Sequence, residues 1–359
     1  MKRIYTLFSL LALSLVLCSP SCSKESGKGG SSWDEINGSL GQGDGIKVPD
    51  SAYLTAGCTE RNRQTAEEWR AAACHKNTRN AAWVYTAMVT KYADAPEKLA
   101  ARLQVLGFRD VYLSCPKTMY DNADKWLKTF VSCCHSASMK VHAVRISSNE
   151  LLLNPSDVLK EVAIISGYNS KVSQAERLDG IAADLEVHIA KEGRVPGLAY
   201  AWNSSTGYGV GKDNDQLLRL GLEVLDKASK ACNEANLQLS EAISYAYQSH
   251  FDTGDLSYGS TPQFLSSCQW VSIMAYLSTK ESIWQKSEPI LKAADRGASV
   301  SIAYKTAVNN VDSPSLQPKG WDYLLETSRY LNTNALTYRA YRGIDVFTYE
   351  GLENMWLAQ

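Results

Sequence analysis

The feature that most constrains the fold is a regular alternation of strand-like and helix-like stretches, which begins near residue 80. The strand-like stretches are short runs of β-branched, aromatic and small apolar residues. Strands alternating with helices form either a closed (β/α)8 barrel or an open, doubly wound sheet. Eight strands at this spacing favour the (β/α)8 TIM barrel, and the open sheet is the alternative. The expected strands are 82–90, 109–115, 140–147, 178–188, 237–247, 269–277, 299–305 and 343–349.

The fourth expected strand, 178–188, differs from the others because it ends in acidic residues. In a regular strand Ala182, Asp184 and Glu186 share one face, with His188 next on that face, and the apolar residues between them share the other. The two carboxyls would then lie about 6.7 Å apart along the strand. Burying carboxyls without a function is costly, so this strand is where we expect the chemistry.

The same stretch carries a family resemblance. Asp179-Gly-Ile-Ala-Ala-Asp184-Leu-Glu186 resembles the Asp-Gly-x-Asp-x-Asp-x-Glu signature of glycoside hydrolase family 18, the chitinases and endo-β-N-acetylglucosaminidases. The opening Asp-Gly, the inner Asp and the final Glu match. Ala182 stands where that family usually has an acid.

A second similarity lies on the sixth expected strand, where Met274-Ala-Tyr276 resembles the family's Met-x-Tyr-Asp. Here Leu277 replaces the Asp. The third strand has Arg145-Ile-Ser-Ser where the family has Ser-x-Gly-Gly, and Phe347 takes the place of the Trp expected on the eighth strand. The resemblance therefore covers residues 80–350 in rhythm, but only strands four and six in motif.

The resemblance implies hydrolysis of a β-linked N-acetylglucosamine bond, with the acetamido oxygen of the substrate as the nucleophile. It implies that Glu186 is the acid and base, that Asp184 is the partner of the acetamide and that Tyr276 is an orienting hydroxyl. A protein nucleophile would need a second acid on a distant strand. Glu241 and Glu350 are the acids to consider for that role. Neither is an obvious second acid, and this absence favours assistance by the substrate over a protein nucleophile.

Further substrate-binding candidates lie at the expected C-terminal ends of strands, where barrel enzymes place their sites. Tyr and Trp suit sugar rings because they combine a flat apolar face with a polar tip, although both also fill ordinary cores. An ion pair of Arg145 with the acids of strand four is the structural alternative for that residue. The candidates are Arg145, Trp202, Tyr247, Met274, Tyr304, Phe347 and Tyr349.

The N-terminus reads as a secretion signal. Lys2 and Arg3 precede an apolar run that ends at Leu17, and Ser21-Cys22 follows a few residues later. This pattern, in residues 1–22, resembles a bacterial lipoprotein signal, with Cys22 acylated after cleavage and plain secretion as the alternative. Residues 23–48 are rich in Gly, Ser and charge and predict a flexible tether. The barrel, with an N-terminal preface, would then occupy 49–359 in a protein anchored by lipid to the cell envelope.

Composition narrows the remaining possibilities. The net charge of −1 gives no electrostatic case for nucleic-acid binding. No metal-site spacing and no Gly-rich phosphate loop is evident, so we expect no cofactor. Seven Cys follow Cys22, and an oxidising envelope would permit disulfides, with Cys58 and Cys74 the first pair to examine.

The sequence leaves three hypotheses. The first is a surface-anchored hydrolase of glycans or glycoproteins that contain β-linked N-acetylglucosamine, with the N-glycan-cleaving type favoured over the chitinase type. The second is an inactive barrel that binds glycan, which the changes at Ala182 and Leu277 favour. The third is a barrel hydrolase for a different sugar.

Overall fold

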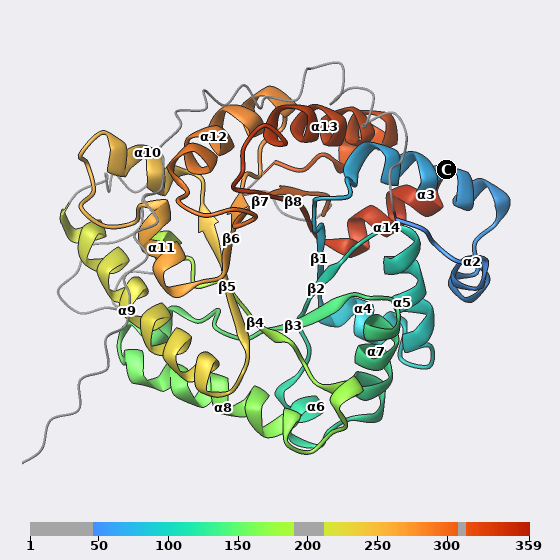
Figure 1. Ribbon diagram of the computed structural model, residues 1–359, viewed down its shortest axis with the longest axis horizontal. Helices are drawn as coiled ribbons and strands as arrows, with labels where there is room; N and C mark the ends of the chain where they lie inside the picture. The colour runs from blue at the N-terminus through green and yellow to red at the C-terminus, as the bar shows by residue number, and fades with distance from the viewer. Residues whose placement is uncertain (1–45, 190–211, 308–313) are drawn as a thin grey trace, which may run out of the picture.

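The computed structural model describes residues 46–189, 212–307 and 314–359, and its centre is a closed barrel of parallel strands. The strands follow one another around the barrel in chain order, and β8 pairs with β1 (Figure 1). Closure removes the free edges of the sheet, so each strand is paired on both sides. The expected (β/α)8 TIM barrel is confirmed. The strands are β1 Ala81–Val84, β2 Asp110–Leu113, β3 Lys140–Val144, β4 Gly180–Ala183, β5 Gln238–Ser244, β6 Trp270–Met274, β7 Val300–Lys305 and β8 Tyr341–Phe347.

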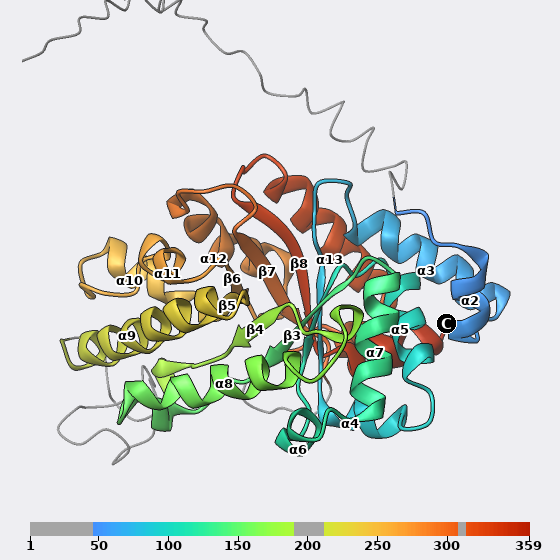
Figure 2. The same cartoon turned by 60° about the horizontal axis from the view of Figure 1, so that its bottom comes forward.

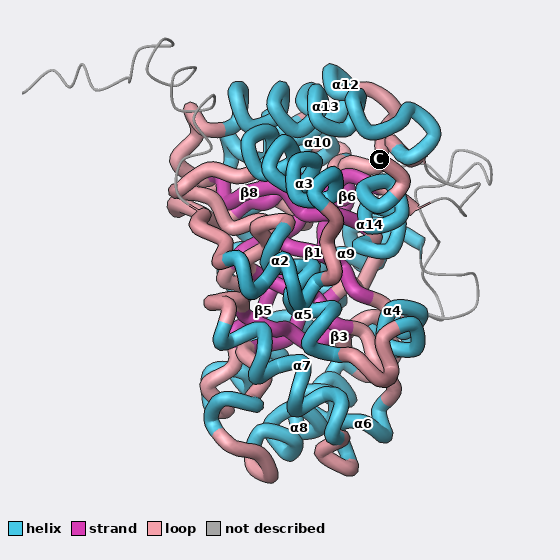
Figure 3. The backbone as a smooth tube through the Cα atoms, turned by 90° about the vertical axis from the view of Figure 1, so that its right-hand side faces the viewer, coloured by secondary structure: helices cyan, strands magenta, loops and turns pink. Residues whose placement is uncertain are grey.

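Helices cover the outside of the barrel (Figures 1 and 2). Two of them, α2 and α3, precede the first strand, and they pack against α5 and against α13 and α14, respectively. Figure 3 shows α3 beside the C-terminal helix α14. The α-helices are α2 Asp50–Ala56, α3 Glu60–Ala73, α4 Thr86–Lys91, α5 Pro96–Val105, α6 Lys117–Asp121, α7 Lys125–Ser136, α8 Val158–Asn169, α9 Lys212–Glu234, α10 Ala246–Asp252, α11 Thr261–Ser267, α12 Lys280–Ala293, α13 Gly320–Ala335 and α14 Tyr349–Leu357.

The barrel wall separates two apolar cores. The larger core lies between the strands and the helices and includes the fully buried Trp69, Phe130 and Trp356. The smaller core fills the barrel interior. Because strands of this kind are buried on both faces, their sequences are nearly continuous apolar runs, and the polar alternation that would mark an exposed face is missing. The interior core consists of Ala81, Trp83, Tyr112, Ala182, Ala242, Trp270 and Met274.

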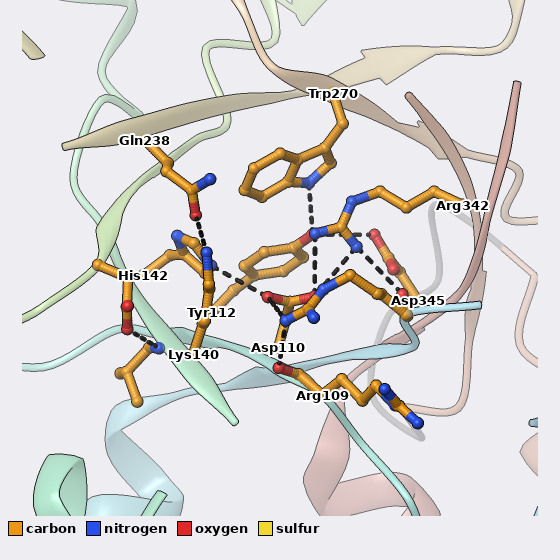
Figure 4. Close-up of polar contacts among 12 residues, drawn as sticks. Arg109, Asp110, Tyr112, Lys140, His142, Gln238, Trp270, Arg342 and Asp345 are labelled. Carbon is orange, nitrogen blue, oxygen red and sulfur yellow. Dashed lines mark hydrogen bonds and ion pairs between the residues drawn. The ribbon is translucent and has the colours of Figure 1, made fainter. Parts of the chain in front are cut away.

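The N-terminal end of the barrel is filled by a buried polar network (Figure 4). At its centre the Asp110 carboxylate accepts hydrogen bonds from the Arg342 guanidinium at 2.9 and 3.0 Å and from Arg79 at 3.0 Å. The His142 ring lies 3.3 Å from the same carboxylate. The Arg342 guanidinium also stacks 4.2 Å from the centre of the Trp270 ring. Paired in this way, the charges can remain buried at the start of the strands.

The charge state of Asp110 follows from these contacts. Burial alone would raise the pKa of its carboxyl, but the hydrogen bond from His142 and the guanidinium of Arg342 lower that pKa well below its ordinary value. Deeper in the barrel, Asp345 accepts a hydrogen bond of 2.6 Å from Ser272, and burial raises its pKa to about 6. The network therefore holds one firmly ionised acid and one acid that titrates near neutral pH.

Several expected strands are too long at their C-terminal ends. The first ends at Val84, and α4 occupies most of the remainder of the stretch 82–90. The fifth ends at Ser244 and the eighth at Phe347, which places Tyr247 on α10 and Tyr349 on α14. Beyond the barrel rim the backbone has no neighbouring strand to pair with, so the chain bends away even where its composition suits a strand.

The cysteines of the described residues are all free thiols. The Sγ atom of Cys74 lies 3.8 Å from the carbonyl oxygens of Leu106 and Gly107, and no disulfide joins it to Cys58. The expectation that this pair is the first to examine for a disulfide therefore finds no support. Within the described ranges, no helix combines the length and the apolar character needed to cross a membrane.

Candidate active site

The two acids of the motif lie at the C-terminal end of the barrel, directly after β4. The Asp184 backbone N–H donates to the Ile146 carbonyl at 2.9 Å, which ties this exit to the end of the neighbouring strand. Glu186 has a φ of 44°, in the left-handed region that non-glycine residues rarely adopt. This conformation costs about 1 kcal/mol. The regular strand expected through residue 188 is therefore wrong, and the two acids lie on a bend whose shape other contacts must maintain.

Both carboxyls hold their protons more tightly than ordinary acids. Burial, with a further contribution from the charge of Glu186, raises the pKa of Asp184 to about 7. Burial also raises the pKa of Glu186. Among the described residues, the Oδ1 atom of Asp184 has no hydrogen-bond partner. A carboxyl pair that keeps a proton near neutral pH can supply a general acid.

Aromatic side chains from β1 and β8, and from the residues just after β1 and β6, form a group at the same end of the barrel. The rings of Tyr276 and Phe347 are stacked with centroids 5.0 Å apart, and Tyr85 meets Phe347 edge-on at 5.6 Å. Trp83 lies beneath, with its ring centroid 6.2 Å from that of Phe347. These faces suit an apolar sugar face, and their polar tips can hydrogen-bond hydroxyl groups.

The charges of the two acids affect the pKa values of both tyrosines in this group. Burial raises the pKa of Tyr276 well above its ordinary value, and the charges of Asp184 and Glu186 raise it further. The same causes raise the pKa of Tyr85. Both phenols therefore keep their protons throughout the range in which proteins work, so each is a permanent hydrogen-bond donor beside the acids.

The opening Asp-Gly of the motif, Asp179 and Gly180, has a structural role at the N-terminal end of the barrel and lies away from the two acids. The Asp179 carboxylate accepts from the Val141 backbone N–H at 2.8 Å and lies 2.9 Å from the His135 ring nitrogen, at the N-terminal end of the strands. A Cβ on Gly180 would lie 2.3 Å from the Gln238 carbonyl oxygen, so only glycine fits there. An open hollow of about 1180 Å³ lies beside these residues. We place the site at the other end, where the acids with raised pKa values lie.

The structure places two predicted substrate-binding residues on the outside of the barrel wall. The Arg145 guanidinium is paired with Glu161 on α8, 2.5 Å away, and lies over the Tyr120 ring. Tyr304 is fully buried in the outer core, and its hydroxyl is 2.9 Å from the Ser328 hydroxyl on α13. Both predictions were wrong, because these side chains point toward the helices and not into the barrel.

The two tyrosines that lie on helices are also wrong as substrate contacts. Tyr247 is 2% exposed, and its hydroxyl is 2.8 Å from Nδ1 of His188, which lies in the 3-10 turn Val187–Ile189. Tyr349 is fully buried and donates a 3.2 Å hydrogen bond to Glu353. Met274 belongs to the interior core directly below the aromatic group. Trp202 and Cys22 lie outside the described residues.

Sequence reasoning missed three residues that the fold brings to this end of the barrel. Trp83 and Tyr85 come from the first strand, which carried no recognisable motif, although an aromatic pair spaced two apart shares one face of a strand. Glu241 was considered only as a distant second acid. In the structure its carboxyl contacts the backbone between the two motif acids.

We expect Asp184→Asn to stabilise the protein at alkaline pH. The folded state raises the pKa of this carboxyl, so it binds the proton more tightly than the unfolded chain does between about pH 4 and 7. Stability is therefore lost as pH rises through this window, and the variant should gain about 4 kcal/mol at pH 8 and little at pH 4. Urea unfolding at both pH values measures the difference, with exposed Asp322→Asn as the matched control. A gain of the same size at pH 4 would contradict a charge-based cause.

Comparison with known proteins gives a likeness of fold. No protein-family model matches the chain, and no curated protein matches it.

Within the described residues, no group of three His, Cys, Asp or Glu side chains is placed to hold a metal ion.

Similar solved structures include a GH18 chitinase from Pseudoalteromonas aurantia, with a TM-score of 0.48 and 12% identity over 78% of this chain and 98% of the chitinase. The glycoside hydrolase domain of PgaB (BpsB) from Bordetella bronchiseptica gives a TM-score of 0.49 and 13% identity over 77% of this chain and 96% of that domain. The xylanase and alpha-amylase inhibitor protein XAIP-II from Scadoxus multiflorus gives 0.45 and 12% over 77% of this chain and 95% of the inhibitor. These are likenesses of fold alone, so a function has to be argued from the residues of the site.

Proposed function

We propose that the protein is a glycoside hydrolase that cleaves a β-linked N-acetylglucosamine bond with participation of the acetamido group of the substrate. The observation that carries the proposal is the pair Asp184 and Glu186, which lies at the C-terminal end of a TM barrel with raised pKa values. Tyr276 and Phe347 lie beside this pair. The resemblance of the sequence around Asp184, Glu186 and Tyr276 to family 18 motifs supports the same proposal.

The proposed reaction uses one proton of the pair. Glu186 donates its proton to the glycosidic oxygen, and the bond from that oxygen to the anomeric carbon breaks as the acetamido oxygen of the substrate bonds to that carbon. The new ring, closed by the bond between the acetamido oxygen and the anomeric carbon, carries a positive charge. The Asp184 carboxylate stabilises this charge while Tyr276 orients the acetamide. Glu186 then takes a proton from water, whose oxygen opens the ring and restores the acetamide.

The positions of the other nearby acids support participation of the substrate over a protein nucleophile. Glu241 is 3% exposed and Asp345 is fully buried, so neither carboxyl is open to a bound sugar. Glu350, the other acid considered from the sequence, is exposed in the first turn of α14. A retaining enzyme with a protein nucleophile needs both carboxyls at the anomeric carbon.

The test of this function is hydrolysis of a panel of N-glycoproteins and chitooligosaccharides by the wild-type protein, with mass spectrometry of the products. Release of fragments with an N-acetylglucosamine reducing end supports the proposal. A second candidate, glycan binding without cleavage, is favoured by one observation: Ala182 places no acid below Asp184. Retention of an oligosaccharide by the wild type with no product formed would establish that candidate instead.

We also propose, from the sequence alone, that the protein is a lipoprotein anchored at Cys22 in the bacterial cell envelope. We expect the protein to incorporate an alkyne fatty acid during growth and to partition into Triton X-114 detergent. Cys22→Ser should abolish both, whereas Cys18→Ser should leave them unchanged. Incorporation that persists in Cys22→Ser would contradict the anchor. This test does not depend on any glycosidase activity.

A further inference from the structure

Glu241 lies in the middle of β5 on the face of the wall that points toward the helices. Its neighbours Ala242 and Ile243 belong to the interior and the outer core, respectively, and alternation along the strand places Glu241 with Ile243. The residue is 3% exposed. Burying a carboxyl in such apolar surroundings lowers stability, so its presence there points to a function.

The carboxyl of Glu241 contacts the segment between the two motif acids. Its Oε1 atom accepts a 3.2 Å hydrogen bond from the Leu185 backbone N–H, while Oε2 has no hydrogen-bond partner among the described residues. On the opposite side, the Asp184 N–H is held by the Ile146 carbonyl at 2.9 Å. The bend with the left-handed Glu186 is therefore fixed from β5 through Glu241 and from the end of β3 through Ile146.

We propose that Glu241 is a positioning residue whose carboxyl holds the Leu185 N–H and thereby aims Asp184 and Glu186 at the substrate. The inference rests on the proposed function and deepens it. A displacement of about 1 Å at a reacting group can cost roughly a hundredfold in rate, so a single backbone hydrogen bond at this bend has catalytic leverage.

The surroundings of Glu241 keep its carboxyl uncharged at neutral pH. Burial raises its pKa well above the ordinary value, the charges of Asp184 and Glu186 raise it further, and the hydrogen bond from Leu185 only partly offsets them. Tyr247 on α10 and Cys268 before β6 also face it, and neither side chain can carry a positive charge, so neither supplies a countercharge. Glutamine reproduces both the neutral state and the acceptor oxygen.

The test compares Glu241→Gln with Glu241→Met in the full-length protein. Glutamine should leave kcat and KM within about threefold of wild type, because its carbonyl oxygen accepts the same hydrogen bond. Methionine has a similar volume and no such acceptor, and it should lower kcat roughly 10- to 100-fold with KM nearly unchanged. A loss that appears equally in both variants, or no loss in Glu241→Met, would overturn the inference.

A readout without activity separates this inference from the proposed function. In protein labelled with 15N-leucine, the Leu185 amide signal, assigned with Leu185→Ile, should be protected from hydrogen exchange in wild type and Glu241→Gln. It should lose that protection in Glu241→Met, while amides of α13 keep theirs. Should Glu241→Met fail to fold, Glu241→Gln still decides: an unprotected Leu185 amide there overturns the inference. An inactive wild type with this exchange pattern would refute the hydrolase alone.

Discussion

Glu186→Gln is expected to abolish glycan hydrolysis and to leave glycan binding intact. Glutamine keeps the size of the side chain, but its amide is not acidic enough to protonate a leaving oxygen. General acid catalysis contributes roughly 10²–10⁴-fold, so kcat should fall by about three orders of magnitude. Because the aromatic faces of Tyr276 and Phe347 remain, the dissociation constant for an oligosaccharide should stay within about threefold of the wild-type value.

The matched control for this variant is Glu350→Gln, which removes a carboxyl from an exposed position in the first turn of α14. We expect it to retain wild-type kcat. Hydrolysis that persists in Glu186→Gln would show that another group is the acid and that the roles of the strand-four residues are wrong. Equal loss in both variants would indicate a cause other than acid catalysis.

The largest expected effect on stability is that of Asp110→Asn. The carboxylate is fully buried and holds two guanidiniums, those of Arg79 and Arg342, at 2.9–3.0 Å. An amide cannot balance these charges, and breaking a buried ion pair by removing one partner costs about 3–5 kcal/mol. The melting temperature should fall by roughly 10 °C, measured by circular dichroism together with urea unfolding.

Acid should reduce the stability difference between Asp110→Asn and wild type. The folded state lowers the pKa of Asp110, so its contribution is present above the ordinary carboxyl range and disappears as pH falls below about 4. The control is Asp121→Asn, which removes an exposed pair with Lys117 and should change stability by less than about 0.5 kcal/mol. A loss below 1 kcal/mol in Asp110→Asn would show that the network contributes little.

The sequence by itself favoured the barrel over an open doubly wound sheet, and it singled out the acids of the fourth strand-like stretch. Eight apolar strand-like stretches alternating with helix-like stretches leave few topologies, and the right-handed crossover of parallel strands turns that rhythm into a barrel. The acids at the end of 178–188 fell at the C-terminal end of the barrel because parallel strands place all such ends together. Tyr276, predicted from the Met-x-Tyr of the sixth strand-like stretch, lies near these acids, and its role stays a prediction.

Only the tertiary structure decided which side chains face the barrel interior and where each strand stops. Arg145 directly follows β3 and Tyr304 lies in β7, and strands buried on both faces have no polar alternation to distinguish inside from outside. Tyr247 and Tyr349 lie on helices and not on strands, because strand pairing ends at the rim of the barrel.

Glu241 gives the same lesson for a polar residue. Its sequence neighbourhood suggested at most a second acid, and its contact with the Leu185 backbone follows from a pairing of β4 with β5 that brings together residues far apart in the chain. The local sequence pattern predicts which residues of a strand can be buried. Which groups then meet across the wall is set by register and closure, and these depend on all eight strands at once.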